Sequence, residues 1–86
     1  MTKRPRLCLY GTGQCRLCDQ AAALVAPIAA AFGWKLERPD VAEDDVLFER
    51  YGERVPILAR SDREEELGWP FDARMAQDYL MASGDR

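Results

Sequence analysis

The chain has 86 residues, enough for one small domain but too few for a second hydrophobic core. With 12 Lys and Arg against 15 Asp and Glu, its net charge is −3, so a general nucleic-acid-binding surface is not indicated. The absence of histidine excludes His-dependent catalytic triads, His metal clusters and His general bases.

The first predicted elements are a strand over residues 6–10 and a helix that begins at or just after Cys15. The strand is a short, mostly apolar run followed by Gly11-Thr12-Gly13, which is typical of a buried strand ending in a tight loop. Apolar residues then recur at helical spacing as far as Phe32. Gly33 follows, a residue type that suits the position just after a helix.

Cys15 and Cys18 lie three positions apart where this loop meets the predicted helix. Unpaired N–H groups and partial positive charge at the start of a helix stabilise a thiolate, the reactive form of cysteine. Arg16 adds a positive charge beside Cys15, and Cys18 lies about one turn further on, within reach of a reversible disulfide. The position predicts thiol–disulfide chemistry. Cys8, in the middle of the strand, is expected to be a small core residue.

A second strand and a short helix are predicted next. Residues 34–38 alternate apolar and charged side chains, which is the pattern of a half-exposed strand. Asp40, Asp44 and Asp45 are candidate caps and first-turn acids for a short helix that Gly52 ends.

Two more strands and a last helix complete the chain. Residues 55–59 form a third predicted strand and residues 64–67 a shorter fourth one, with a turn between them. Asp72 is the expected cap of the last helix. The residues expected to face inward from this helix are Met75, Ala76, Tyr79 and Leu80.

The predicted order is therefore β-α-β-α-β-β-α, in the α/β class. The strand–helix–strand start implies a parallel pair joined by a right-handed crossover, and the closing pair of strands adds antiparallel neighbours. We expect a four-stranded mixed sheet flanked by three helices.

At this point the chain resembles the glutaredoxin branch of the thioredoxin-like fold. The resemblance covers nearly the whole chain. It rests on Leu9-Tyr10 before the CxxC pair, on the segment Tyr51-Gly52-Glu53-Arg54-Val55-Pro56-Ile57-Leu58, and on Gly68 and Asp72 before the final helix. The stretch Gly68-Trp69-Pro70-Phe71-Asp72 is similar to that of small glutaredoxin-like proteins whose physiological role is unassigned.

The resemblance implies that the Val55–Pro56 peptide bond is cis and faces the cysteine pair. In that conformation the Val55 backbone is free to pair with an incoming thiol peptide. The chain also departs from the family pattern. Thr12 stands where glutaredoxins usually carry a basic residue for a glutathione carboxylate, Arg54 replaces a threonine and Trp69 replaces a glycine. Arg16 or Arg54 is a candidate for the missing cation, since a guanidinium pairs well with a carboxylate.

We predict a thiol–disulfide oxidoreductase in which Cys15 is the nucleophile and Cys18 the resolving thiol. The expected partner is a disulfide-containing protein or a small thiol substrate. No bound cofactor or metal is expected, and glutathione is a candidate reductant or co-substrate. The predicted substrate-binding residues are Val55, Pro56, Arg16, Arg54, Trp69 and Asp72.

Composition also bears on compartment and partners. No apolar stretch approaches the length of a membrane span, and the run that ends at Gly11 is too short for a signal-peptide core. Three cysteines, an odd number, suit a reducing compartment better than a secreted disulfide framework. We expect one glutaredoxin-like domain over residues 1–86, monomeric and cytoplasmic, without membrane or nucleic-acid partners.

Three alternatives stay open. A zinc site built on Cys15 and Cys18 needs about four ligands, for which Cys8 or carboxylates would have to serve. A non-catalytic adaptor on the same fold would use Trp69-Pro70-Phe71 as its contact patch. A glutathione-assisted iron–sulfur carrier would use Cys15 as a cluster ligand.

Overall fold

The structure, a computed structural model, describes residues 5–84. The predicted order of elements is confirmed, with one short 3-10 helix added before the second α-helix. In chain order the elements are β1 (Leu7–Tyr10), α1 (Arg16–Ala31), β2 (Leu36–Glu37), the 3-10 helix η1 (Val41–Glu43), α2 (Asp45–Tyr51), β3 (Ile57–Arg60), β4 (Leu67–Gly68) and α3 (Ala73–Met81).

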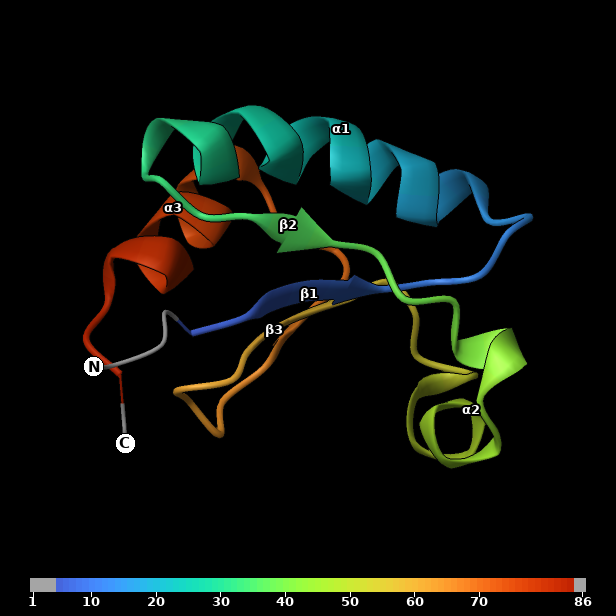
Figure 1. The fold of residues 1–86 in the computed structure, drawn as a ribbon. Helices are drawn as coiled ribbons and strands as arrows, with labels where there is room; N and C mark the ends of the chain where they lie inside the picture. The colour runs from blue at the N-terminus through green and yellow to red at the C-terminus, as the bar shows by residue number, and fades with distance from the viewer. Residues whose placement is uncertain (1–4, 85–86) are drawn as a thin grey trace.

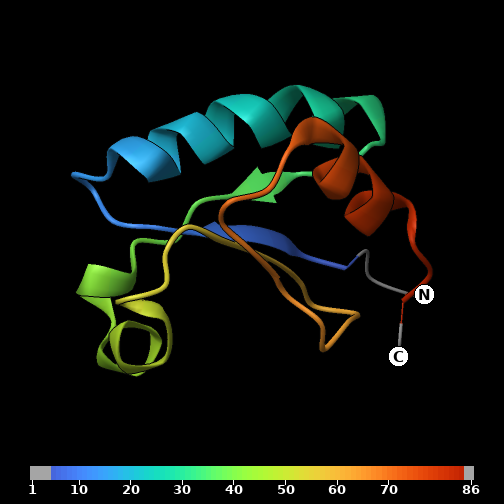
Figure 2. The ribbon, with the colours of Figure 1, turned by 180° about the vertical axis from the view of Figure 1, so that it is seen from behind.

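The four strands form a mixed sheet in the order β2-β1-β3-β4. β1 runs parallel to β2 and antiparallel to β3, and β4 is antiparallel to β3. α1 and α3 cover one face of the sheet, and α2 lies on the other side, near one end (Figure 1). The view from behind shows the same layers (Figure 2). The expected four-stranded mixed sheet flanked by three helices is therefore confirmed.

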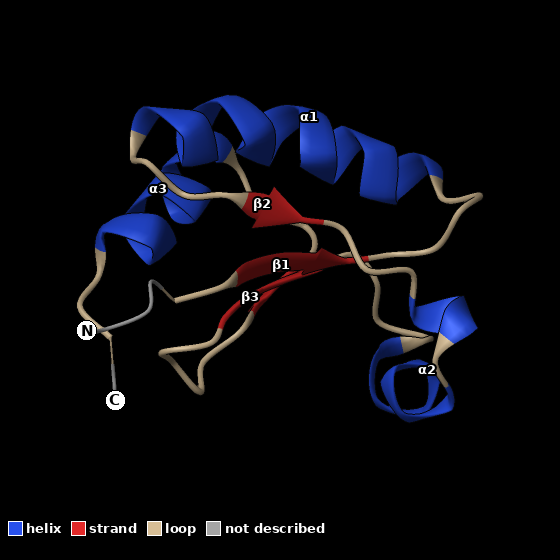
Figure 3. Ribbon diagram, in the orientation of Figure 1, coloured by secondary structure: helices blue, strands red, loops and turns tan. Residues whose placement is uncertain are grey.

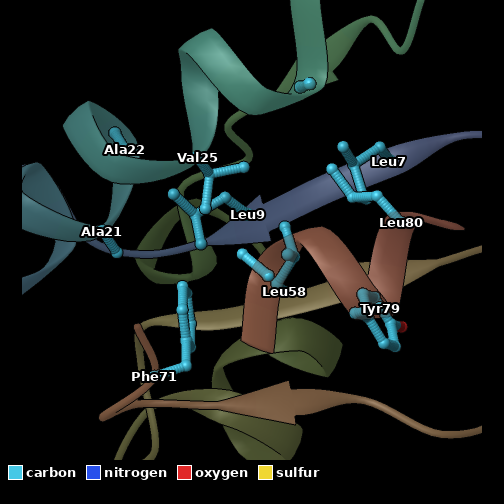
Figure 4. Close-up of a cluster of buried hydrophobic side chains, with 11 residues drawn as sticks. Leu7, Leu9, Ala21, Ala22, Val25, Leu58, Phe71, Tyr79 and Leu80 are labelled. Atoms are coloured by element: carbon cyan, nitrogen blue, oxygen red, sulfur yellow. The ribbon is translucent and has the colours of Figure 1, made fainter. Parts of the chain in front are cut away.

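The main core lies between the sheet and the pair α1 and α3. Side chains alternate between the faces of a strand, so Leu7 and Leu9 of β1 point into this core together with Leu58 of β3 (Figure 4). Each of these three leucines is at most 1% exposed. The helices contribute small or branched residues to the same cluster, among them Ala21, Val25, Ala76 and Leu80.

A second, smaller cluster attaches α2 to the opposite face of the sheet. Its buried members are Val41, Tyr51 and Ile57, and Tyr10 packs against them. The rings of Tyr10 and Tyr51 are stacked with their centroids 4.3 Å apart. Burial of aromatic rings in a stacked pair favours this packing beyond the area it removes from water. The end of β1 is thereby held between both layers.

The helix ends follow the predicted capping pattern. Asp44 accepts hydrogen bonds from the N–H groups of Val46 and Leu47 at the start of α2, and Asp72 accepts one from Met75 at the start of α3. Gly33, after α1, has a φ of 76°, the left-handed conformation that favours glycine after a helix. These residues fix where the helices begin and end.

The strand bounds differ from those predicted. The strand predicted over residues 34–38 is only Leu36–Glu37, because the Trp34 N–H still bonds to the Ala29 carbonyl at the end of α1. The strand predicted over residues 55–59 begins two residues later, at Ile57, after Pro56, which has no N–H for a ladder.

The fourth strand is also displaced, from residues 64–67 to Leu67–Gly68. A loop connects β3 to β4 over most of this stretch (Figure 3). The Glu65 carbonyl accepts a hydrogen bond from the Tyr79 hydroxyl of α3, and the Glu66 carboxylate accepts one from the Tyr51 hydroxyl. These contacts turn the loop toward the helices instead of along β3.

One inward-facing residue was predicted wrongly. Met75 is 44% exposed, whereas Ala76, Tyr79 and Leu80 are buried. Met75 lies at the margin of the buried face of α3, in a surface hollow that it lines together with Leu67 and Tyr79. Its side chain is not part of the core cluster.

Candidate active site

The two cysteines of the CxxC motif lie at the start of α1. Cys15 directly precedes the helix and Cys18 lies in its first turn. They form a disulfide, with their Cα atoms 5.1 Å apart. Cys15 is half-buried and Cys18 is only 1% exposed. The two cysteine residues therefore differ in their exposure to solvent.

Cys15 occupies the N-cap position of α1. Its backbone is extended, and its sulfur accepts a hydrogen bond from the Cys18 N–H at 3.0 Å. The Cys15 carbonyl accepts the first helical hydrogen bond, from the N–H of Asp19, at 3.1 Å. A serine or aspartate oxygen usually fills this place and satisfies one of the free N–H groups. Here a sulfur is held at the positive end of the helix.

The loop between β1 and α1 borders the pair at the end of the sheet where α2 also lies (Figures 1 and 2). Beside Cys18 is a hollow of about 320 Å³. Gly11, Thr12, Arg38 and Asp40 are among its lining residues. Arg38 is held there by an ion pair with Asp19 at 3.2 Å. This hollow was not expected from the sequence, because its two sides come from segments far apart in the chain.

The Val55–Pro56 peptide bond is cis. Pro56 is buried, and Val55 is half-buried. Tyr10 of β1 pairs with Ile57 of β3, so the register, continued by one residue, puts Pro56 across from Gly11. Pro56 thus lies at the same end of the sheet as the loop that borders Cys18.

A second cis bond joins Trp69 to Pro70, beside the first. The Trp69 N–H donates to the Pro56 carbonyl at 3.2 Å, which fastens the two segments together. The Trp69 ring meets Phe71 edge to face, with centroids 5.1 Å apart. Phe71 is 5% exposed and belongs to the main core. The adaptor alternative named Trp69-Pro70-Phe71 as its contact patch. This prediction was wrong for Phe71, because its ring is buried in the core.

The charged residues predicted to bind substrate are exposed. Arg16 lies in the first turn of α1. Arg54 donates to the Arg50 carbonyl at 3.1 Å, and its guanidinium lies 5.6 Å from the centre of the Tyr51 ring. Asp72 caps α3. The contacts of Arg54 and Asp72 are thus structural ones, and a role of either residue toward a substrate stays a prediction.

The third cysteine stands apart from the pair. Cys8 is 8% exposed and has no disulfide partner. Burial raises the pKa of its thiol, so the unreactive protonated form dominates at neutral pH. The prediction that Cys8 is a core residue is confirmed.

Two further searches concern the described residues alone. Across residues 5–84, no three or more Cys, Asp and Glu side chains come together as a metal-binding group, so the donor set of the zinc alternative is not assembled there. Within the same range, no helix has the length and apolar character to cross a membrane.

Comparison with known proteins agrees with this geometry. Residues 6–80 match the family model described as "Glutaredoxin-like domain (DUF836)". No match was found among curated proteins. The X-ray structure of protein XcR50 from X. campestris is 36% identical, with a TM-score of 0.72, over 90% of this chain and 97% of the other.

Two solution structures are also similar. That of XcR50 is 35% identical with a TM-score of 0.74, over 92% of this chain and 97% of the other. Protein Ne2328 from Nitrosomonas europaea is 23% identical with a TM-score of 0.73, over 93% and 95% of the two chains, and shows the shared fold alone. With its thioredoxin-like order of elements and its disulfide-bonded CxxC pair, the chain belongs to the glutaredoxin-like domain (DUF836) family.

Proposed function

We propose that the protein is a thiol–disulfide oxidoreductase that uses Cys15 as nucleophile and Cys18 as resolving thiol. One observation carries the proposal. The Cys15 sulfur caps α1, and the Cys15 residue is more exposed than Cys18, to which it is joined by a disulfide. A cysteine at a helix N-terminus with a second cysteine in disulfide reach is arranged for exchange.

The reaction starts from the reduced pair. The Cys15 thiolate attacks one sulfur of a substrate disulfide, that S–S bond breaks, and the leaving thiolate takes a proton from water. The Cys18 thiolate then attacks the Cys15 sulfur of the mixed disulfide and expels the second substrate thiol. The substrate disulfide is reduced to two thiols, and the Cys15–Cys18 pair is oxidised. Two glutathione molecules, which leave as one glutathione disulfide, or one external dithiol return the pair to its reduced state.

The substrate class is a disulfide-containing protein or a small thiol held as a mixed disulfide. Val55 offers its backbone groups at the end of the sheet that carries the pair, where an extended peptide would add as a strand, and the cis bond to Pro56 fixes their direction. Arg16 and Arg54 are the candidate cations for a glutathione carboxylate. Trp69, whose N–H bonds to the Pro56 carbonyl, and Asp72, which caps α3, complete the set of proposed substrate contacts.

The test uses three variants and one disulfide substrate, the mixed disulfide of glutathione with a small peptide. Cys18→Ser is expected to accumulate a mixed disulfide at Cys15, whereas Cys15→Ser should form none and be inactive. Cys8→Ala is the matched control, because it removes a thiol outside the pair and should keep wild-type exchange. Intact-mass spectrometry of each quenched reaction gives the result.

Full activity in both Cys15→Ser and Cys18→Ser would contradict the proposal. If the wild-type protein exchanged no disulfide and bound a protein partner in either redox state, the adaptor alternative would replace the oxidoreductase.

A further inference from the structure

Gly11 is packed against the resolving cysteine. A Cβ atom built on Gly11 would lie 3.0 Å from the Cys18 sulfur and 3.1 Å from the Cys18 Cβ. Both separations are shorter than ordinary van der Waals contact between such atoms, about 3.5–4.0 Å. A side chain at position 11 would therefore fit only if the Cys18 side chain moved by a few tenths of an ångström.

The Gly11 backbone is held in place on both sides. Its N–H donates to the Pro39 carbonyl at 3.3 Å, and its carbonyl accepts from the Val41 N–H at 2.9 Å. The preceding residue, Tyr10, is paired with Ile57 in the sheet. The Gly11 backbone is thus held by β1 on one side and by the segment 39–41 on the other. A side chain at position 11 could therefore be accommodated only by a movement of Cys18.

Cys18 can move by different amounts in the two redox states. In the dithiol the sulfur is released from Cys15 and can change rotamer about the Cα–Cβ bond, which relieves its own contact with a new methyl group. The 3.1 Å contact with the Cys18 Cβ is the same in both states, so only the contact with the sulfur depends on the redox state. In the disulfide the sulfur is bonded to Cys15, which is itself fixed as the helix cap. A side chain at position 11 would therefore cost more free energy in the disulfide than in the dithiol.

We propose that Gly11 is a positioning residue that favours the oxidised state of the pair by leaving room for the Cys18 sulfur. The inference rests on the proposed function, since it concerns the redox balance of that same site. It does not depend on which sulfur is the nucleophile or on which substrate is reduced.

The chain offers a matched control two residues away. A Cβ atom on Gly13 would meet the Asp40 carboxylate at 3.5 Å, which is an ordinary contact. Neither Gly11 nor Gly13 has a positive φ, so alanine is compatible with the backbone at both positions. Both substitutions add one methyl group to the same loop, but only Gly11→Ala places it against Cys18.

The experiment equilibrates wild type, Gly11→Ala and Gly13→Ala with mixtures of reduced and oxidised glutathione. In this equilibrium the protein disulfide and two glutathione thiols exchange for the protein dithiol and one glutathione disulfide. For Gly11→Ala we expect the equilibrium constant for reduction of the Cys15–Cys18 disulfide to rise about tenfold. A free-energy cost of this order is typical when a methyl group is added to a well-packed site. Gly13→Ala should stay within twofold of wild type.

Denaturant unfolding of each variant in both redox states gives the second readout. Gly11→Ala should raise the equilibrium constant of unfolding more for the oxidised protein than for the reduced one. The ratio of the two increases should equal the factor by which the glutathione equilibrium shifts. If Gly11→Ala is folded in the reduced state and unfolded in the oxidised state, the proposal is supported, because the side chain is then compatible with the dithiol alone.

Equal destabilisation of both states, failure to fold in both, or the same equilibrium shift for Gly13→Ala would overturn the proposal. These outcomes are distinct from a failure of the proposed function. An inactive protein would still show the glutathione-dependent equilibrium of its Cys15–Cys18 pair.

Discussion

The backbone N–H of Cys18 donates a hydrogen bond to the Cys15 sulfur across 3.0 Å. The donor is one of the N–H groups at the start of α1 that has no carbonyl partner within the helix. When the disulfide is reduced, the same N–H faces the Cys15 sulfur as a thiolate, and a hydrogen bond to a charged acceptor is stronger than one to a neutral acceptor. The hydrogen bond that caps the helix thus also favours the thiolate form of Cys15, the proposed nucleophile.

The first prediction concerns alkylation of the reduced protein. With limiting iodoacetamide at pH 6, Cys15 should be modified about tenfold faster than Cys18, because a helix N-terminus enriches the thiolate and Cys18 is buried. Peptide mass spectrometry assigns the modified residue. Cys15→Ser supplies the control, because the fast labelling assigned to Cys15 should be absent in this variant. Faster labelling of Cys18 would reverse the two proposed roles.

The second prediction concerns the cap of α3. The Asp72 carboxylate accepts a hydrogen bond from the Met75 N–H at 2.8 Å. Asp72→Ala should lower the free energy of unfolding by about 1 kcal/mol, whereas Asp72→Asn should change it little, because asparagine caps helices about as well as aspartate. Urea unfolding followed by circular dichroism measures both. Equal losses in the two variants would mean that the charge, and not the cap, stabilises this end of the helix.

The third prediction concerns acid stability through Arg60. This buried guanidinium pairs with Asp62 at 2.6 Å and donates to the carbonyls of Tyr79 and Ala82. The hydrogen bonds from Arg60 hold the pKa of Asp62 below its usual value. The stabilisation is therefore complete above the unfolded pKa, about 3.9, and is lost as the pH falls through the lower folded value.

Asp62→Asn should accordingly be less stable than wild type at pH 7, by about 2 kcal/mol, because a charge-assisted hydrogen bond is weakened. The difference should shrink as the pH falls below about 4, where the carboxylate of the unfolded protein takes up a proton, and should disappear below the lower pKa of the folded protein. Urea unfolding of both proteins between pH 2 and pH 7 measures this difference in the free energy of unfolding. Glu65→Gln is a suitable control, since it neutralises a paired carboxylate whose side chain is 68% exposed. A pH-independent difference would exclude the carboxylate as the cause.

Features encoded within a few residues could be predicted from the sequence. The short apolar run over residues 6–10 identified β1 as a buried strand, and aspartates identified the starts of α2 and α3. The Cys15 position followed from the same reasoning, because a helix start is visible in the periodicity of the residues that follow it. Local geometry and local pattern agree at these positions.

Features that depend on contacts between distant segments could not be predicted. An arginine at the end of a strand gives no sign that it will be buried, and Arg60 is buried because the end of α3 supplies carbonyl acceptors. The second cis bond, before Pro70, likewise follows from no local pattern. The closeness of Gly11 to Cys18 requires the packing of β1 under α1, which the motif spacing does not contain.

The last prediction concerns the thiol that the reaction does not use. Cys8 is only 8% exposed, at the wall of a surface hollow beside β1, and desolvation raises its pKa, so its thiolate is scarce and little exposed in the folded protein. In fully reduced protein, a thiol reagent such as a nitrobenzoate disulfide should consume the CxxC thiols rapidly and Cys8 at least about a hundredfold more slowly, since Cys8 reacts only when the strand opens. Mild urea should accelerate the slow phase and leave the fast phase nearly unchanged. Cys8→Ala should lack the slow phase altogether, which assigns it. Three thiols reacting at one rate would show that Cys8 is accessible, and a slow phase that survives in Cys8→Ala would assign the protected thiol to Cys18.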